Sequence, residues 1–165
     1  MADIVYRRMV LSDAEEVAEM EKTIFTMPWS YNSIVHELTE NKAARYLVAE
    51  VDGHVIGYAG VWIVLDEGHV TNVAVREEYR GRGIGQELMR RLMQYASNLG
   101  AAFCMLEVRR SNERAQHVYY KLGYVDLGVR KRYYEDNHED ALILVCDHLP
   151  EPQEDFTEEE TVRIS

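Results

Sequence analysis

Long apolar runs are missing from this sequence of 165 residues. None reaches the roughly 18–20 residues that a membrane-spanning helix needs, so we expect no membrane partner. The first residues, Met1 to Arg8, lack the basic-then-apolar order of a secretory signal peptide. Cysteine is also scarce, because Cys104 and Cys146 are the only two and each lies in an apolar, strand-like run. Two buried free thiols suit a reducing compartment, and we therefore expect a cytoplasmic protein.

Sequence signals for a metal site and for a nucleophilic serine are missing too. The six histidines are scattered and lack the short paired spacings of zinc motifs. The sequence has no Gly-x-Ser-x-Gly turn, and neither cysteine carries a sequence cue for activation. We therefore expect no metal and no serine or cysteine nucleophile.

Positive charge is in the minority. The chain has 18 Lys and Arg residues against 29 Asp and Glu residues, a net charge of −11. Proteins that bind nucleic acid usually present a basic surface, so we expect no nucleic-acid partner. An acidic balance suits a basic peptide partner, and it would equally serve plain solubility.

The length suits one domain, which we expect over residues 1–149. The remaining segment, 150–165, contains six acidic residues and one Arg, or −5 of the net charge, which leaves −6 for the rest. Its few apolar residues cannot offset the entropy of ordering, so we expect a disordered acidic tail.

Hydrophobic periodicity predicts one mixed sheet with flanking helices. Expected strands cover 4–9, 45–51, 55–64, 69–75, 103–108, 124–129 and 141–146, and expected helices begin near Ser12, Ser30, Gly83 and Ser111. Ser12 and Glu15 match a capping box. Asp52-Gly53 is a hairpin signal, whereas the strand–helix–strand unit around Gly83–Leu99 must be a parallel crossover. The expected class is α/β (α+β), with a mixed, mostly antiparallel central sheet.

The strongest local signal is the run Arg80-Gly81-Arg82-Gly83-Ile84-Gly85 at a helix start. Glycines let backbone N–H groups converge, and the helix N-terminus adds partial positive charge, so the run predicts an anion cradle, typically for phosphate. A plain Gly-rich turn is the alternative. A Walker loop is excluded because no Gly-Lys-Ser/Thr follows, and a dinucleotide fingerprint is excluded because Gln86 stands where its third Gly or Ala is needed.

Arg80-x-x-Gly83-x-Gly85 resembles the Gln/Arg-x-x-Gly-x-Gly/Ala signature of the GNAT superfamily of N-acetyltransferases. The similarity extends over about Ile4 to Leu149. It includes the runs Val70-Thr71-Asn72-Val73-Ala74-Val75, Leu106-Glu107-Val108-Arg109-x-Ser111-Asn112 and Tyr119-x-x-Leu122-Gly123-Tyr124. Phe25-x-x-Pro28-Trp29-Ser30, Tyr133-Tyr134 and His138-Glu139-Asp140-Ala141 resemble the RimI-type subgroup, the ribosomal-protein alanine acetyltransferases.

The resemblance implies a GNAT fold that uses acetyl-CoA as co-substrate. It implies that the strand ending at Val75 splays from the strand at 103–108, with the pantetheine arm pairing with the backbone of Val73, Ala74 and Val75. The pyrophosphate would sit on the amides of Gly81, Arg82, Gly83, Ile84, Gly85 and Gln86, and Asn112 would hydrogen-bond the pantetheine. The resemblance further implies Glu107 as general base, Tyr119 as general acid, and Phe25, Pro28, Trp29, Tyr133 and Tyr134 as walls of a peptide groove.

The reaction itself requires such a pair. The attacking amine must be neutral, and it loses a proton as the new bond forms. An α-amine has a pKa of about 7.7–8.0, so a larger fraction of it is neutral at pH 7 than of a lysine amine, whose pKa is about 10.4. A carboxylate acting through a water could therefore suffice as its general base. The leaving thiolate needs a proton, which a tyrosine hydroxyl can supply. Tyr120 points about 100° away from Tyr119 on a helix, so Tyr119 is preferred.

Structural readings of these residues remain open at this stage. Glu107 could be a structural acid paired with Arg109 or Arg110, and Tyr119 could be a packing residue. The expected function is acetyl transfer to a protein N-terminal α-amine, namely the N-terminal alanine of the eighteenth small-subunit ribosomal protein, by a monomer or weak dimer. The alternatives are an enzyme for a small amine, such as a polyamine or aminoglycoside, and a non-catalytic acetyl-CoA-binding module.

Overall fold

The computed structural model describes residues 2–153 and 160–164. The strands are β1 (Ala2–Arg8), β2 (Ala44–Val51), β3 (His54–Val64), β4 (Glu67–Val75), β5 (Phe103–Arg109), β6 (Val125–Arg130), β7 (Ala141–Cys146) and β8 (Glu160–Ile164). The helices are α1 (Ala14–Ile24), α2 (Tyr31–Thr39), α3 (Ile84–Asn98) and α4 (Glu113–Lys121), with short 3₁₀ helices at Leu11–Asp13 and Glu77–Tyr79. The predicted order of elements is confirmed, and β8 is added at its end.

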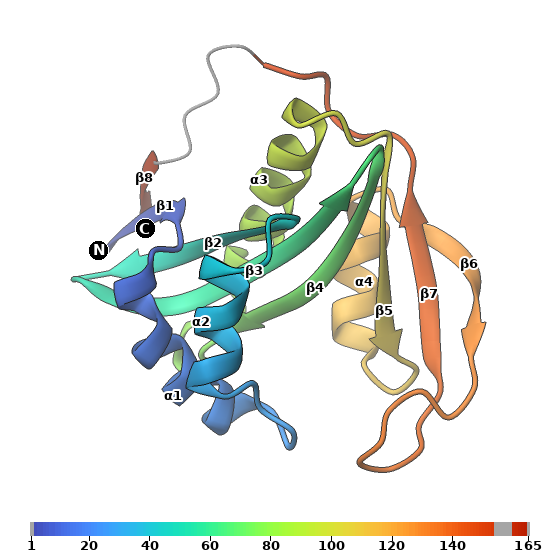
Figure 1. Ribbon diagram of the computed structural model, residues 1–165, viewed down its shortest axis with the longest axis horizontal. Helices are drawn as coiled ribbons and strands as arrows, with labels where there is room; N and C mark the ends of the chain where they lie inside the picture. Colours follow the sequence, from blue (N-terminus) through green and yellow to red (C-terminus); the bar gives the residue numbers. More distant parts are fainter. Residues whose placement is uncertain (1, 154–159, 165) are drawn as a thin grey trace.

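The strands form one sheet in the order β6-β7-β5-β4-β3-β2-β1-β8 (Figure 1). Among the described strands, only β4 and β5 pair in parallel, and α3 forms the crossover between them. The other neighbours are antiparallel. The predicted mixed, mostly antiparallel α/β sheet with one parallel crossover is therefore confirmed.

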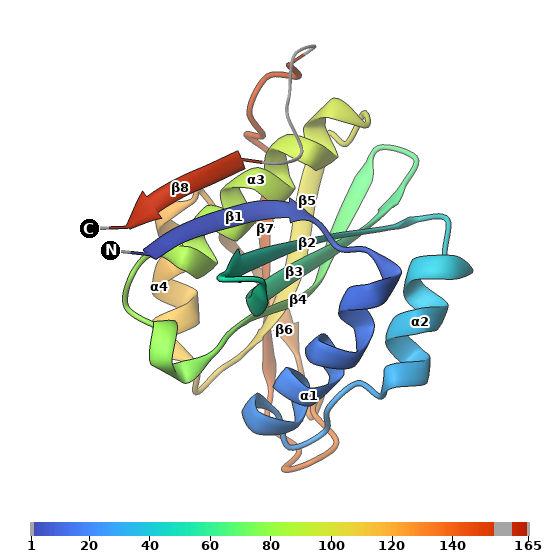
Figure 2. The same ribbon diagram turned by 90° about the vertical axis from the view of Figure 1, so that its left-hand side faces the viewer.

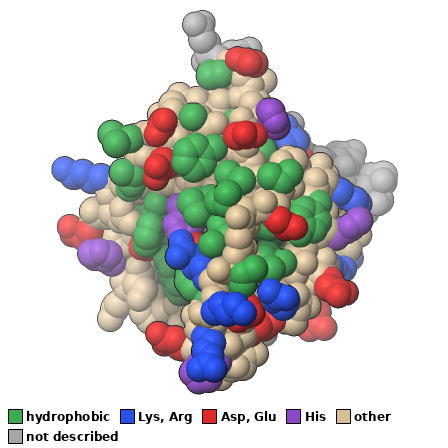
Figure 3. Space-filling model, turned by 90° about the vertical axis from the view of Figure 1, so that its right-hand side faces the viewer, with side chains coloured by type: hydrophobic (Ala, Val, Ile, Leu, Met, Phe, Trp, Pro, Cys, Tyr) green, Lys and Arg blue, Asp and Glu red, His purple; other side chains and the backbone are tan. Residues whose placement is uncertain are grey.

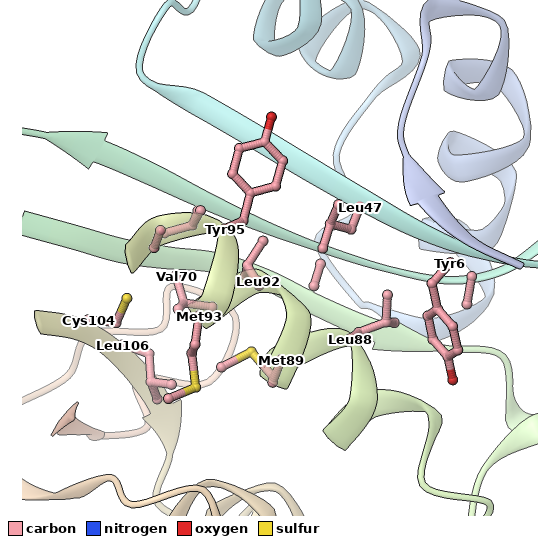
Figure 4. Close-up of a cluster of buried hydrophobic side chains, with 14 of the residues drawn as sticks. Tyr6, Leu47, Val70, Leu88, Met89, Leu92, Met93, Tyr95, Cys104 and Leu106 are labelled. Carbon is pink, nitrogen blue, oxygen red and sulfur yellow. The ribbon is translucent and has the colours of Figure 1, made fainter. Parts of the chain in front are cut away.

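Each face of the sheet has its own apolar core. On one face, α3 buries a stripe at helical spacing that includes Leu88, Met89 and Leu92 (Figure 4). On the other face, α1 and α2 pack over β2 and β3, with Met20 and Tyr58 at the centre. On the edge strand β6, Val125 and Leu127 are exposed. Hydrophobic side chains gather on the side of the molecule that Figure 3 shows.

The hairpin and one helix cap agree with the sequence. Asp52 and Gly53 both have positive φ, at 51° and 80°, as a two-residue turn between right-twisted strands requires. Ser30 caps α2 by accepting the Ser33 N–H at 3.1 Å.

Two expected caps are wrong. The Ser12–Glu15 capping box does not form, because a 3₁₀ turn precedes α1 and Asp13 accepts the Val10 N–H instead. Arg7 holds the Asp13 carboxylate in that position through two 2.8 Å hydrogen bonds. Asn112, rather than Ser111, caps α4.

Within the segment 150–165, expected as a disordered acidic tail, the structure describes residues 150–153 and 160–164. The backbone of 150–153 lies along α3, where Gln94 donates to the Glu151 carbonyl and Ser97 to the Pro150 carbonyl. Glu160–Ile164 then pair with β1 in antiparallel fashion (Figure 2). Without β8, β1 would be an edge strand with unpaired N–H and C=O groups. Backbone hydrogen bonding to β1 therefore favours the formation of β8. Residues 154–159 lie outside the described residues.

The described helices were also compared with the dimensions of a bilayer. None of them is long and apolar enough to span a membrane.

Candidate active site

A split in the sheet lies at the centre of the site. Within the described residues, β4 pairs with β5 at three positions, and His69 opposite Met105 is the last of them. Further along, Val73, Ala74 and Val75 pair with β3 on one side only. A register shift against Gly60 and Val61 lies just before this stretch and leaves Thr71 without an opposite residue, as in a β-bulge, which increases local twist. The edge of β4 that faces β5 is therefore open to pair with an extended ligand.

A cavity of about 610 Å³ occupies the split and reaches the start of α3. The residues that line it include most of those expected to bind the cofactor, namely Val73, Ala74, Val75, Gly81, Gly83, Ile84, Gly85, Gln86 and Asn112. The Arg82 side chain does not line the cavity and instead stacks over the Tyr79 ring, 5.2 Å from its centroid. Arg80 and Arg114 line it and add positive charge that the sequence analysis did not assign.

The loop before α3 has the backbone geometry of an anion cradle. Gly81 and Gly83 have φ of 80° and 78°, a left-handed conformation that side chains disfavour, and Gly83 is the N-cap of α3. Arg80 Nε donates to the Val75 carbonyl at 3.0 Å, which fastens the loop to the end of β4. The helix N-terminus and nearby cations favour a pyrophosphate here, and the open β4 edge beside it favours a peptide-like arm. The residues present thus fit acetyl-CoA.

A second cavity of about 530 Å³ adjoins the first. The two cavities share Val73, Asn112 and Tyr119 in their walls, so ligands bound in them would meet there. Of the expected groove residues, Phe25, Trp29 and Tyr134 line the second cavity. Pro28 and Tyr133 do not, although the Tyr133 ring stands edge-on to Tyr134 with centroids 5.1 Å apart. We call this second space the acceptor cavity.

The acceptor cavity is rich in carboxylates. Besides Glu107, its lining includes Glu21, Glu135, Asp136 and Glu139. The sequence analysis noted the acidic balance of the chain but assigned none of these four to the site. Such a lining attracts a cationic ligand.

Glu107 points from β5 into the acceptor cavity, and its side chain is 8% exposed. His69 Nε2 lies 2.6 Å from its Oε2, and Arg130 Nε lies 3.3 Å from its Oε1. Burial alone would raise the pKa of Glu107, but the hydrogen bonds and charges of His69 and Arg130 outweigh it and lower that pKa. The carboxylate is therefore ionised at neutral pH.

The alternative pairing of Glu107 with its sequence neighbours is wrong. Arg109 pairs with Asp136 and Glu139, and Arg110 lies near Asp140. The true partners, His69 and Arg130, come from β4 and β6 and were missed because no local spacing connects them to Glu107.

Tyr119 lies on α4 in the wall that the two cavities share. Burial raises the pKa of its hydroxyl to about 12, so the hydroxyl keeps its proton at neutral pH. Tyr120 is exposed and its hydroxyl donates to Asp126 at 2.7 Å, away from the cavities. Of these two tyrosines, Tyr119 is thus the one that lines the cavities.

Groups of three or more His, Cys, Asp or Glu side chains that could hold a metal ion were sought as well. The described part of the chain contains none.

Comparisons with known proteins agree with this geometry. Residues 14–124 match the model of the acetyltransferase (GNAT) family. The chain is 48% identical over 138 residues to a putative ribosomal protein bS18-alanine N-acetyltransferase of Bacillus subtilis, covering 84% of this chain and 91% of that protein. It is 32% identical over 139 residues to the ribosomal protein bS18-alanine N-acetyltransferase of Haemophilus influenzae, covering 81% and 92%. The crystal structure of the ribosomal-protein-S18-alanine N-acetyltransferase from Escherichia coli superposes with a TM-score of 0.81 at 26% identity, covering 93% of this chain and 99% of that one.

Proposed function

Because this chain belongs to the acetyltransferase (GNAT) family, in its RimI-type branch, and is an N-acetyltransferase, we propose that it acetylates a protein N-terminal α-amine. The substrate that we propose is the N-terminal alanine of ribosomal protein bS18, by transfer from the relatives described above. One observation carries the proposal: the acceptor cavity meets the cofactor cavity at Val73, Asn112 and Tyr119.

Acetyl-CoA, the co-substrate of the family, supplies the thioester that the amine attacks. The open edge of β4 from Val73 to Val75 would hold the pantetheine arm through backbone hydrogen bonds. The amides at the start of α3, from Gly81 to Gln86, would receive the pyrophosphate, with Arg80 and Arg114 lining the same cavity. The thioester would then react at the wall that the two cavities share, which includes Tyr119.

Glu107 and Tyr119 then divide the proton transfers between them. Glu107 is an ionised carboxylate facing the acceptor cavity, so it accepts the proton that the amine loses, directly or through a water. Tyr119, protonated at neutral pH, donates a proton to the leaving thiolate. Glu107 is a weak base, which suits an α-amine better than a lysine amine. Roughly a tenth or more of an α-amine is already neutral at pH 7.

The acidic lining supports a basic N-terminal segment as the acceptor. A polyamine or aminoglycoside is also cationic, so charge alone does not separate the small-amine alternative from the peptide. The length of the acceptor separates the two. An N-terminal segment extends to the walls at Trp29 and Tyr134, which line the acceptor cavity alone, whereas a small amine does not need them.

The test is a direct assay with labelled acetyl-CoA. The acceptors are a peptide beginning Ala-Arg-Tyr, the same peptide with its α-amine blocked and an internal lysine free, and spermidine. We expect label on the free N-terminus alone. Better turnover of spermidine than of any peptide would overturn the substrate class, and no transfer to any amine would favour the non-catalytic module. With cell lysate in place of the peptides, the labelled N-termini identify the natural acceptor.

A further inference from the structure

The five carboxylates that line the acceptor cavity differ in how they are paired within the described residues. Asp136 and Glu139 share one cation, because the Arg109 guanidinium lies 2.9 Å from the first and 3.3 Å from the second. Glu107 already has two partners of its own, one from β4 and one from β6. The protein itself therefore supplies hydrogen-bond donors to all three of these carboxylates.

Glu21 and Glu135 are the other two carboxylates of the lining. Glu21 is 1% exposed, and its Oε1 accepts the Trp29 N–H. Glu135 is exposed, and no hydrogen bond or ion pair joins its side chain to another described residue. Within the described residues, Glu135 is therefore the carboxylate of the acceptor cavity that is both accessible and unpaired.

The backbone that carries Glu135 is held on both sides. Its neighbour Tyr134 donates its backbone N–H to the Glu139 carbonyl at 3.2 Å. Its other neighbour, Asp136, accepts a hydrogen bond at 2.6 Å from Thr26, which belongs to the loop after α1. A carboxylate on a backbone that is already fixed can pair with a ligand without the cost of ordering that backbone.

Glu135 also lies at a short distance from the reacting end of the cavity. Along β5, Glu107 and Arg109 are two residues apart on one face of the strand, a distance of about 6.6 Å. The Arg109 guanidinium lies over the ring of Tyr134, the residue before Glu135. An extended chain covers about 3.3 Å per residue, so this separation is on the order of two residues of an acceptor.

We propose that Glu135 selects a basic side chain at the second residue of the acceptor; this rests on the proposed function. The amine to be acetylated must reach the wall that the two cavities share, at Val73, Asn112 and Tyr119, so the first residue occupies that wall. The second residue, about 3.8 Å further along the chain, is the first that lies wholly in the acceptor cavity. An Arg or Lys side chain at that position forms an ion pair with the free carboxylate of Glu135.

Three peptides that differ only at the second residue test this role: Ala-Arg-Tyr, Ala-Gln-Tyr and Ala-Glu-Tyr, each continued by the same uncharged residues. The proteins are wild type, Glu135→Gln and Glu135→Lys. Glu40→Lys is the matched control, because Glu40 is also exposed and unpaired within the described residues but lines neither cavity. Steady-state kinetics give kcat and KM for each peptide at low and at high salt.

We expect the wild-type KM to be roughly 2- to 5-fold lower for Ala-Arg-Tyr than for Ala-Gln-Tyr, the scale of an exposed ion pair. The ratio of the KM for Ala-Glu-Tyr to the KM for Ala-Arg-Tyr should be largest in wild type, smaller in Glu135→Gln and smallest in Glu135→Lys. High salt should reduce these differences, because it screens exposed charges. The kcat values should change little, since Glu135 does not contact the reacting atoms. Glu40→Lys should keep the wild-type ratio.

The same KM ratio in wild type and in Glu135→Lys would overturn the selecting role of Glu135. An equal change of the ratio in Glu40→Lys and in Glu135→Lys would overturn it as well, because the net charge of the protein would then be responsible. In both cases wild type acetylates the peptides, so the proposed function stands. A wild-type enzyme that modifies none of the three peptides would instead remove the proposed function, and the role of Glu135 with it.

Discussion

The Arg109 guanidinium lies over the Tyr134 ring, its Cζ 3.9 Å from the ring centroid. The same side chain binds Asp136 at 2.9 Å and Glu139 at 3.3 Å. One residue of β5 thus fixes the whole segment between β6 and β7 that walls the acceptor cavity. The arrangement depends on a planar, forked cation, which stacks and forms several hydrogen bonds at once.

Arg109→Lys should therefore raise the KM for the Ala-Arg-Tyr peptide. Loss of a cation–π contact worth about 0.5–2 kcal/mol corresponds to roughly a 2- to 30-fold increase. Steady-state kinetics measure it. Arg110→Lys is the control, because Arg110 is exposed and lies 3.8 Å from Asp140, and its KM should not change. Equal KM values for wild type and Arg109→Lys would show that Tyr134 is held without this contact.

Gly83→Ala should weaken acetyl-CoA binding. An alanine at φ 78° costs roughly 1–2 kcal/mol of stability and alters the loop that lines the cofactor cavity, although its Cβ meets no protein atom within 4 Å. Gly53→Ala is the matched control, since Gly53 has φ 80°, an equally open surrounding and a place on a hairpin that lines neither cavity. Both variants should melt earlier, but only Gly83→Ala should lose part of the upward shift in melting temperature that acetyl-CoA produces. An equal shift in melting temperature with acetyl-CoA in both variants would show that the loop before α3 does not bind the cofactor.

Tyr119→Phe should lower kcat by roughly 10²- to 10⁴-fold, because the leaving thiolate loses its proton donor. The pKa of Tyr119 is raised to about 12, so its hydroxyl stays protonated and should cause no fall in turnover on the alkaline side up to about pH 11. Tyr120→Phe removes a hydroxyl that binds Asp126 and should leave the rate unchanged. The pH dependence of kcat for the three proteins checks both statements, and a wild-type rate in Tyr119→Phe would contradict them.

Glu21→Gln should stabilise the protein at neutral pH. Glu21 is 1% exposed, and its Oε1 accepts the Trp29 N–H. Its Oε2 makes no hydrogen bond of ordinary geometry within the described residues, and burial raises the pKa of Glu21 although Trp29 and Tyr58 act in the opposite direction. Above about pH 4.3 the unfolded chain ionises more readily than the folded one, so this residue costs stability as pH rises. Glutamine keeps the Trp29 contact and removes that cost. The gain in melting temperature should be present at pH 7 and shrink as the pH falls toward 4.

Glu107→Gln should change the melting temperature in the opposite direction in the same experiment. The pKa of Glu107 is lowered in the fold, so its carboxylate contributes stability above the unfolded pKa and loses it on acidification. This variant should melt earlier than wild type at pH 7 and turn over slowly, with little change in acetyl-CoA binding. If both glutamine variants shifted stability in the same direction, the two carboxylates would not differ in the way described.

Truncation after Leu149 should lower the melting temperature, while truncation after Gln153 should lower it less. Residues 150–153 supply three hydrogen bonds to α3, at Gln94, Ser97 and Asn98. Each is worth roughly 0.5–1.5 kcal/mol, and 1 kcal/mol shifts the melting temperature of a chain of this size by about 2–4 °C. Acetyl transfer per folded molecule should be the same in both. Identical melting temperatures would mean that the backbone of 150–153 does not stabilise the domain.

The sequence predicted most of the sheet and little of the acceptor site. The alternation of apolar and polar residues in strands and the spacing of apolar residues in helices involve only neighbours in the sequence. The strands and α3 could therefore be predicted directly from the sequence. The His69–Glu107 pair depends on which residues of two parallel strands stand side by side, 38 positions apart, and no local pattern encodes that register. Arg109 was considered as a partner of Glu107 because the two are alternate residues of one strand and share a face. It binds Asp136 and Glu139 of the segment between β6 and β7 instead, and no local pattern predicts that contact. The tail was judged by composition alone, which takes no account of an unpaired backbone edge at β1.

Ala2 of β1 and Ile164 of β8 are paired, so the two ends of the described chain lie on adjacent strands (Figure 2). The strand order places β3, β2 and β1 between this edge and β4. A fluorescent label, an affinity tag or a second protein attached at either end would thus depart from the β1–β8 edge of the sheet, which β2 and β3 separate from β4. The same proximity makes the chain a candidate for circular permutation, with a short linker joining the old ends and new ends opened at Leu65, which is 90% exposed at the turn between β3 and β4.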